Sequence, residues 1–163
     1  MFALPCQDYL GRTLTFILLF LMLHPIKTTV RGILFITEEN ETNIVLIHRI
    51  KQGKEYYAFP GGKIEQGETH QETLIREMKE EINADIEVGD FFAEHRNPKL
   101  NDHDYFYLCT HLQGEIKPGD GPEFKKKLID NVYEIVKIPL KELHHYLLFP
   151  TTIKEMVIER YGK

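Results

Sequence analysis

The chain has 163 residues, with 20 lysine and arginine residues against 25 aspartate and glutamate residues and a formal net charge of −5. This length suits one ordinary domain, and the 42% hydrophobic and 28% charged residues exclude a disordered chain, a collagen and a multi-span membrane protein. The acidic balance argues against a protein that binds nucleic acid mainly by neutralising phosphates. The cysteines, Cys6 and Cys109, show no CxxC or metal-ligand spacing, which favours reduced thiols in a cytoplasmic protein.

Residues 1–26 form a hydrophobic N-terminal extension that we treat separately from the domain predicted for residues 27–163. Within it, residues 13–23 (TLTFILLFLML) are uncharged and apolar, but they fall short of the roughly 20 residues that a membrane-spanning helix needs. No small-residue cleavage site follows them. Three interpretations stay open: a cleaved signal, a membrane-associated anchor, and an extension upstream of a natural start at Met22.

The domain begins with segments rich in β-branched and apolar residues. Residues 28–37 and 44–50 are separated by the turn-forming string ENETN, which predicts a hairpin. Residues 56–59 predict a short strand that ends at Pro60, and the Gly61-Gly62 pair after it predicts a loop.

A helix is predicted from Thr69, because Thr69 and Glu72 have the spacing of a capping box and an apolar stripe with helical spacing follows them. Beyond it, the pattern predicts strands at 86–94, 105–116 and 132–138, polar connections at 97–104 and 117–130, a turn or short helix at 139–144, and a closing helix at 151–161. Strands on both sides of one central helix indicate an α/β sandwich rather than a regularly alternating βαβ fold.

Three glutamates share one face of the central predicted helix. Glu77, Glu80 and Glu81 stand at i, i+3 and i+4, so their carboxylates converge and repel one another, and Arg76 supplies only one positive charge. A hard divalent cation, which takes carboxylate and phosphate oxygens, would balance the rest. The same string also suits a solvated acidic face.

The spacing around this string favours the metal site. Residues 62–84 resemble the Nudix box, whose pattern is G-x5-E-x7-R-E-U-x-E-E-x-G-U, with U a bulky apolar residue. The matching residues are Gly62, Glu68, Arg76, Glu77, Met78, Glu80 and Glu81. FPGG at 59–62 and FPTTIKE at 149–155 extend the resemblance to MutT-like members of the family.

Two positions depart from the family pattern. Asn83 stands where the family has glycine, and Ala84 stands where a bulkier residue is usual. Because asparagine adopts the left-handed backbone conformation at helix ends more readily than other non-glycine residues, we expect the turn to survive.

The resemblance implies a Nudix-type α/β/α sandwich with a mixed central sheet. It also implies hydrolysis, dependent on Mg²⁺ or Mn²⁺, of a nucleoside diphosphate linked to another moiety, including removal of unwanted nucleoside triphosphates. The catalytic residues it implies are Arg76, Glu77 and Glu80. The metal ligands it implies are Glu77, Glu80, Glu81, a carbonyl of Gly61 or Gly62, and a later acidic residue, with Glu123 the first candidate and Glu115 the second.

The roles of two box residues are less narrowly defined. We expect Arg76 to orient Glu77 or a neighbouring carboxylate through a bidentate pair. Glu68 is either a metal ligand or an acidic residue that favours the helix N-terminus.

The sequence identifies no substrate-binding residue. The rings near the implied cleft by sequence order suit a core equally well; they are Tyr56, Tyr57, Phe59, His145 and Phe149. The expected partner is a small nucleotide, and nucleic acid is disfavoured by the net charge. Membrane contact through residues 13–23 and a homodimer both stay open.

Two alternative functions also stay open. The first is a non-catalytic Nudix-fold module that binds a nucleotide for regulation, which the intact REMKEE string disfavours. The second is an RNA 5′-end pyrophosphohydrolase, in which residues 125–127 (KKK) would bind phosphate but which the acidic chain disfavours.

Overall fold

The computed structural model describes residues 26–119 and 131–162. The apolar run at 13–23, Cys6, Glu123 and the lysines at 125–127 lie outside these ranges, so the interpretations that depend on them stay predictions. None of the helices in the described ranges is both long enough and apolar enough to cross a membrane.

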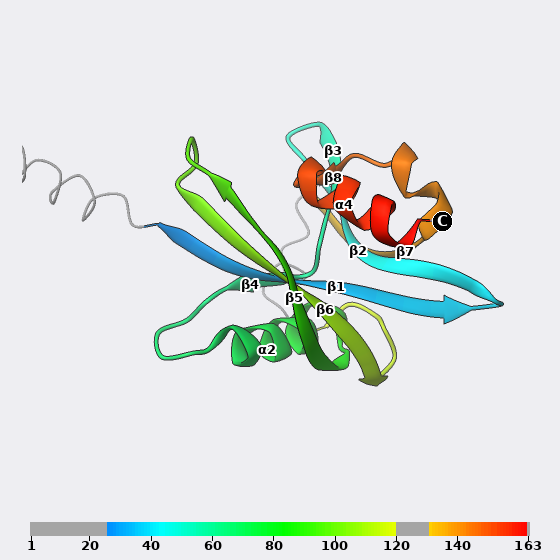
Figure 1. The fold of residues 1–163 in the computed structure, drawn as a ribbon, viewed down its shortest axis with the longest axis horizontal. Helices are drawn as coiled ribbons and strands as arrows, with labels where there is room; N and C mark the ends of the chain where they lie inside the picture. The colour runs from blue at the N-terminus through cyan, green and yellow to red at the C-terminus, as the bar shows by residue number, and fades with distance from the viewer. Residues whose placement is uncertain (1–25, 120–130, 163) are drawn as a thin grey trace, which may run out of the picture.

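A mixed sheet forms the centre of the domain (Figure 1). Its strands are β1 (Lys27–Glu38), β2 (Glu41–Lys51), β3 (Lys54–Ala58), β4 (Gly61–Lys63), β5 (Asp85–Asn97), β6 (Asp102–Gln113), β7 (Asn131–Pro139) and β8 (Leu148–Phe149). The main path runs β5-β6-β1-β2-β3-β8, with β4 paired to β1 and β7 paired to β2. The β1–β6 and β3–β8 pairs are parallel and the other pairs are antiparallel.

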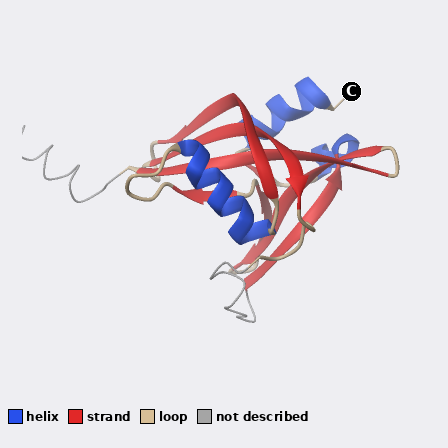
Figure 2. Ribbon diagram, turned by 90° about the horizontal axis from the view of Figure 1, so that it is seen from below, coloured by secondary structure: helices blue, strands red, loops and turns tan. Residues whose placement is uncertain are grey.

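Two α-helices cover opposite sides of this sheet. Helix α2 (His70–Ile82) lies below the strands and α4 (Thr151–Tyr161) lies above them in Figure 1, and Figure 2 shows α2 lying across the face seen from below. A short 3₁₀ helix, η1 (Leu140–His145), leads to β8. The predicted α/β/α sandwich with a mixed sheet is therefore confirmed.

Apolar side chains of β2 point alternately to the two faces of the sheet, and each face is covered by a helix. In β2, Ile44 and Leu46 pack into the core beneath α4, whereas Val45 and Ile47 pack into the core beneath α2. Successive residues of a strand point to opposite faces, so a strand buried on both sides reads as one continuous apolar run. The run IVLI at 44–47 has this pattern.

Three details differ from the sequence-based expectation. Gly61 and Gly62, expected in a loop, lie in β4 and pair with Arg31 and Val30 of β1. Strand β8 was not expected, because two residues carry no periodic signal. Half of the expected connection at 97–104, namely residues 97 and 102–104, belongs to β5 and β6, which form one long hairpin.

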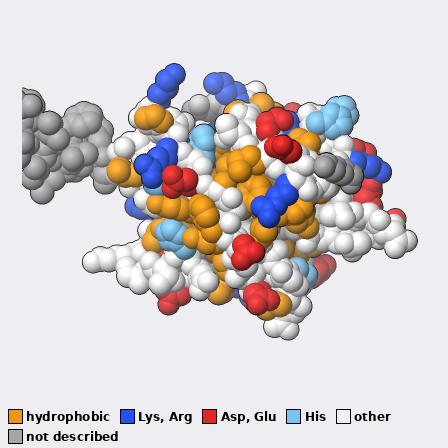
Figure 3. All heavy atoms as spheres, in the orientation of Figure 1, with side chains coloured by type: hydrophobic (Ala, Val, Ile, Leu, Met, Phe, Trp, Pro, Cys, Tyr) orange, Lys and Arg blue, Asp and Glu red, His pale blue; other side chains and the backbone are white. Residues whose placement is uncertain are grey.

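Hydrophobic side chains also reach the surface. Figure 3 shows them gathered in the middle of the face seen in Figure 1, with charged side chains around them. Large apolar side chains that are more than half exposed include Phe91, Leu100 and Leu112. Of the two cysteines, the described one, Cys109, is a buried free thiol whose pKa burial raises to about 12.

Candidate metal centre and substrate pocket

The caps of α2 fix the helix that carries the candidate site. Thr69 accepts a hydrogen bond from the Glu72 amide, and the Glu72 carboxylate accepts one from the Thr69 amide at 2.8 Å, which confirms the predicted capping box. Asn83 ends the helix with φ 54°, in the predicted left-handed conformation. Its side-chain amide also donates to the Glu115 carbonyl at 3.1 Å.

Arg76 of α2 joins the carboxylates of Glu68, which precedes the helix, and of Glu77 and Glu80 on it. Its Nε and Nη2 donate to the two oxygens of Glu68 at 2.7 and 2.9 Å, and its Nη1 donates to Glu77 at 2.8 Å and to Glu80 at 3.3 Å. The bidentate pair that we expected is therefore made with Glu68. The Arg76 guanidinium lowers the pKa of Glu68 to about 2.

This geometry clarifies the role of Glu68. Besides Arg76, its carboxylate accepts hydrogen bonds from the Thr73 hydroxyl at 2.8 Å and the Glu65 amide at 3.1 Å. Both carboxylate oxygens are engaged within the protein. Glu68 thus anchors Arg76, which in turn holds Glu77.

Glu77 lies directly against the backbone of Gly62. A Cβ atom at position 62 would stand 2.3 Å from the Glu77 carboxylate, closer than two such atoms can approach. The Glu77 side chain is 14% exposed, and burial raises its pKa. A side chain at position 62 would displace the Glu77 carboxylate, so glycine at this position lets that carboxylate lie against the backbone.

Glu81 is more deeply buried, with 7% of the residue exposed. The Gly61 amide donates to its Oε2 at 2.8 Å, and the Tyr133 hydroxyl of β7 donates to its Oε1. Burial raises the pKa of Glu81 to about 7, because the ionised form is poorly solvated there. The sequence reasoning missed Tyr133, which comes close to Glu81 only through the sheet.

Arg31 is the second residue that the sequence reasoning missed. It is a lone cation inside the apolar string TTVRGILFIT, and this was the available signal. Its Nη1 donates to the carbonyl oxygens of Gly61 and, at 3.3 Å, Phe59. Arg31 therefore fixes the backbone from Phe59 to Gly61, next to Glu77 and Glu81.

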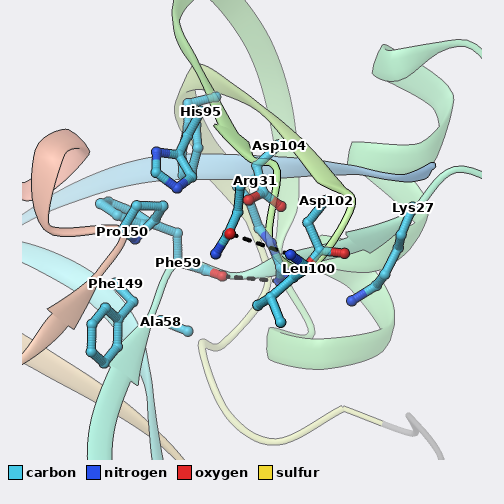
Figure 4. A pocket seen from close by; sticks show the side chains of 12 residues that line it. Lys27, Arg31, Ala58, Phe59, His95, Leu100, Asp102, Asp104, Phe149 and Pro150 are labelled. Atoms are coloured by element: carbon cyan, nitrogen blue, oxygen red, sulfur yellow. Dashed lines mark hydrogen bonds between the residues drawn. The ribbon is translucent and has the colours of Figure 1, made fainter.

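A pocket of about 380 Å³ opens beside this segment (Figure 4). Arg31 contributes to its wall, so the pocket and the glycine backbone are neighbours. The remaining lining combines charged and polar side chains with apolar ones: Lys27, Ala58, Phe59, His95, Asn97, Leu100, Asp102, Asp104, Phe106, Phe149 and Pro150. Such a mixture suits a small ligand with a flat apolar part and a few polar groups.

The comparison with known families adds to this geometry. The model of the NUDIX domain matches residues 27–148. The chain belongs to the Nudix family. This match includes residues 62–84, the segment that resembles the Nudix box, and the segment carries Gly62, Glu68 and the acidic face of α2.

Individual Nudix relatives match part of the chain. ADP-ribose pyrophosphatase of Methanocaldococcus jannaschii is 34% identical over 105 residues, which are 61% of this chain and 59% of that protein. The 8-oxo-dGTP diphosphatase of Proteus vulgaris is 48% identical over 68 residues, 40% of this chain and 61% of that protein. The chain thus spans about three fifths of these curated relatives.

A solved structure shows the shared fold. The crystal structure of a Nudix hydrolase from Nitrosomonas europaea aligns with a TM-score of 0.60 at 22% identity, over 83% of this chain and 72% of that one. At this level of sequence identity, the structural similarity supports a shared fold and nothing further.

Residues 61–81 include oxygen donors of the kind that a hard divalent cation prefers. Glu77, Glu80 and Glu81 offer carboxylates, and Gly61 and Gly62 offer carbonyls, so every donor is an oxygen. Within residues 26–119 and 131–162, however, no three His, Cys, Asp or Glu side chains form a ready metal-holding group. The expected convergence of three carboxylates is therefore partial.

Two contacts account for this partial convergence. Glu80 pairs with Arg76 at 3.3 Å and its side chain is 47% exposed, while Glu81 is engaged by the Gly61 amide. The second-choice acidic ligand, Glu115, pairs with Lys117 at 2.8 Å and is well exposed.

The aromatic candidates for substrate binding separate into two groups. Phe59 and Phe149 line the pocket, whereas Tyr57 packs against His48 and Tyr146. Tyr56 reaches the pocket only indirectly, with its ring 6.1 Å from that of Phe149. His145 stacks on its neighbour His144.

Proposed function

We propose that this chain is a hydrolase that splits a phosphoric anhydride bond in a nucleoside diphosphate linked to another moiety, with Mg²⁺ or Mn²⁺ as cofactor. One observation carries the proposal: the carboxylates of Glu77 and Glu81 lie against the Gly61-Gly62 backbone, beside a pocket of nucleoside size. Membership of the Nudix family and the pyrophosphatase and diphosphatase relatives support it.

Glu77 and Glu81 are the residues best placed to hold the ion, together with a carbonyl of Gly61 or Gly62. When bound, a divalent ion neutralises the charge of the diphosphate and eases ionisation of the attacking water. Glu80, exposed and held only at 3.3 Å by Arg76, is free to turn toward this centre as a further ligand or as the proton acceptor.

The bond changes follow from these placements. A water oxygen attacks one phosphorus of the anhydride, the bond between that phosphorus and the bridging oxygen breaks, and a carboxylate takes the proton of the water. Arg76 keeps the Glu77 carboxylate in position at 2.8 Å, and Arg31 keeps the Gly61 carbonyl fixed. Both cations act by positioning groups before the reaction, which lowers the cost of reorganisation.

The pocket gives the nucleoside part a place to bind, and it favours a small nucleotide over RNA. The free thiol of Cys109 and the nucleotide substrate favour a reducing, cytoplasmic setting, which stays a prediction. Removal of unwanted nucleoside triphosphates stays a prediction. Formation of a homodimer also stays a prediction.

A product screen tests the proposal. Nucleoside triphosphates, nucleotide sugars, ADP-ribose, dinucleoside polyphosphates and a 5′-triphosphate RNA are incubated with the protein, with Mg²⁺ or with a chelator. We expect Mg²⁺-dependent release of a nucleoside monophosphate from at least one small nucleotide. Turnover of the RNA alone would favour 5′-end processing, and Mg²⁺-dependent binding without any turnover would favour the regulatory module.

A further inference from the structure

Strand β6 presents different side chains on its two faces. Asp102, Asp104 and Phe106 line the pocket. Between them in the sequence, the rings of His103 and Tyr105 lie tilted against each other with centroids 4.2 Å apart, and the Tyr105 ring centroid lies 4.4 Å from that of His70 at the start of α2. Because alternate residues of a strand point to opposite sides, residues 102, 104 and 106 face the pocket, and residues 103 and 105 face the side of the helix.

The two aspartates offer acceptors to the pocket. Asp104 accepts a hydrogen bond from the buried Thr29 hydroxyl through Oδ1. In the ranges that the structure describes, Asp104 Oδ2 and the Asp102 carboxylate have no hydrogen-bond partner on another residue, and neither aspartate forms an ion pair. A ligand that enters the pocket therefore meets free carboxylate oxygens.

The opposite side of the pocket is apolar. Figure 4 shows Asp102 and Asp104 on one side and Phe149 and Pro150 on the other. The Phe149 ring is 47% exposed and braced by the edge of Tyr56. An exposed ring beside a proline suits the flat face of a nucleobase better than a sugar, because planar π-systems stack on each other.

Arg31 connects this pocket to the candidate metal centre. It lines the pocket while its guanidinium donates to the Gly61 carbonyl, and the Gly61 amide donates to Glu81. The pocket that Asp102 and Asp104 line therefore adjoins, through Arg31, the glycine backbone where the proposed function places the diphosphate.

We propose that the pocket selects nucleotides whose base carries an exocyclic amino group, and that Asp102 and Asp104 recognise that group. The inference rests on the function proposed above and adds a substrate class to it. An amino N–H donates to a carboxylate oxygen, whereas uracil and thymine place a carbonyl oxygen there. Two acceptors would then face each other, and a desolvated carboxylate would lose its partner.

A two-by-two substrate set tests this selection. The values of kcat/KM are measured for CTP, UTP, dCTP and dUTP, which separate the amino group of the base from the 2′-hydroxyl of the sugar. We expect cytosine to be preferred over uracil by about tenfold or more with either sugar. Equal rates for the two bases would overturn the inference, as would a preference that follows the sugar, because the aspartates would then bind ribose.

Matched variants assign the preference to the residues. In Asp104→Asn the side-chain oxygen can still accept from Thr29, so the amide turns a donor toward the pocket. We expect this variant, and Asp102→Asn, to lose at least about tenfold of the cytosine preference and to gain activity on UTP. Asp90→Asn, an exposed aspartate of β5, removes the same charge and should leave the ratio unchanged. An equal shift in Asp90→Asn would contradict a direct contact.

A binding measurement separates this inference from the proposed function. If no nucleotide is turned over, the hydrolase proposal fails, and the affinities for CTP and UTP are compared by calorimetry with Ca²⁺ present. Tighter binding of CTP that is lost in Asp104→Asn would still support the amino-group contact. Equal affinities would overturn it.

Discussion

Tyr133 donates a hydrogen bond to Glu81, a residue 52 positions earlier in the chain. The bond joins β7 to the acidic face of α2. The Gly61 amide donates to the other oxygen of the same carboxylate at 2.8 Å. Arg49 lies over the Tyr133 ring, 4.8 Å from its centroid. Glu81 is therefore oriented by a strand that lies outside the Nudix box.

Removing this hydrogen bond should weaken the binding of Mg²⁺ at the proposed centre. In Tyr133→Phe the ring stays beneath Arg49 but Glu81 loses a donor that fixes its orientation. Partners that orient metal ligands typically affect affinity by tenfold or more, so we expect the Mg²⁺ concentration for half-maximal activity to rise about tenfold. The Mg²⁺ dependence of the initial rate measures this effect. Tyr161→Phe, in α4, is the matched control, and an unchanged Mg²⁺ dependence in Tyr133→Phe would argue against the role.

Gly62→Ala should lower the catalytic activity while the protein still folds. The new Cβ would stand 2.3 Å from the Glu77 carboxylate, so Glu77 must move away from the glycine backbone. A displacement of this kind costs about 10- to 100-fold in kcat, because the reacting groups lose their alignment. Gly53→Ala is the control, since its Cβ meets nothing within 4 Å although its φ of +71° costs stability. Equal activity in the two variants would contradict the account of Gly62.

The Glu68–Arg76 pair predicts a pH-dependent stability. The folded protein lowers the pKa of Glu68 to about 2, below its ordinary value near 4.5, so the ionised form is favoured on folding. This contribution is complete above pH 4.5 and is lost as the pH falls toward 2. Glu68→Gln should therefore have a lower urea midpoint than the wild type at pH 7, with a smaller difference at pH 3.

The exposed Glu87, of β5, provides the comparison for this series. Glu87→Gln should follow the wild type at both pH values. A Glu68→Gln difference that is the same at pH 7 and pH 3 would mean that its cost is not electrostatic.

The end of α2 predicts an order of stability among variants of Asn83. Asn83→Ala places a side chain without special tolerance in the left-handed conformation and removes the hydrogen bond to Glu115, which together cost about 1–2 kcal/mol. Asn83→Gly loses only the hydrogen bond, so its cost should stay below about 1 kcal/mol. Chemical denaturation checks the order, and an alanine variant as stable as the glycine variant would refute it.

The sequence was most informative where local signals coincide. Thr69, Glu72 and the apolar stripe defined α2, and the spacing from Gly62 to Glu81 defined its acidic face. These signals depend on neighbours within one or two helical turns. For that reason the helix and both of its caps could be predicted from the amino-acid sequence alone.

Long-range pairing explains what could not be predicted. Strand β4 exists only because Gly61 and Gly62 pair with β1, about thirty residues away, and β8 forms only beside β3. The contacts of Arg31 with Gly61 and of Tyr133 with Glu81 depend on the same sheet. Such pairings cannot be predicted from neighbouring residues in the sequence, because a single arginine or tyrosine in a strand can serve many structural roles.

The most direct test of the central claim is the rate of nucleotide hydrolysis during a Mg²⁺ titration, for the wild type and Glu81→Gln. The glutamine keeps the size of the side chain and an oxygen for the Gly61 amide, but it removes the charge that would hold the ion. We predict a Mg²⁺-dependent rate in the wild type and a loss of at least about 100-fold in Glu81→Gln. We also predict a metal-free melting temperature no lower than that of the wild type, because the buried charge is gone. A Glu81→Gln protein with the rate and Mg²⁺ dependence of the wild type would contradict the proposed centre.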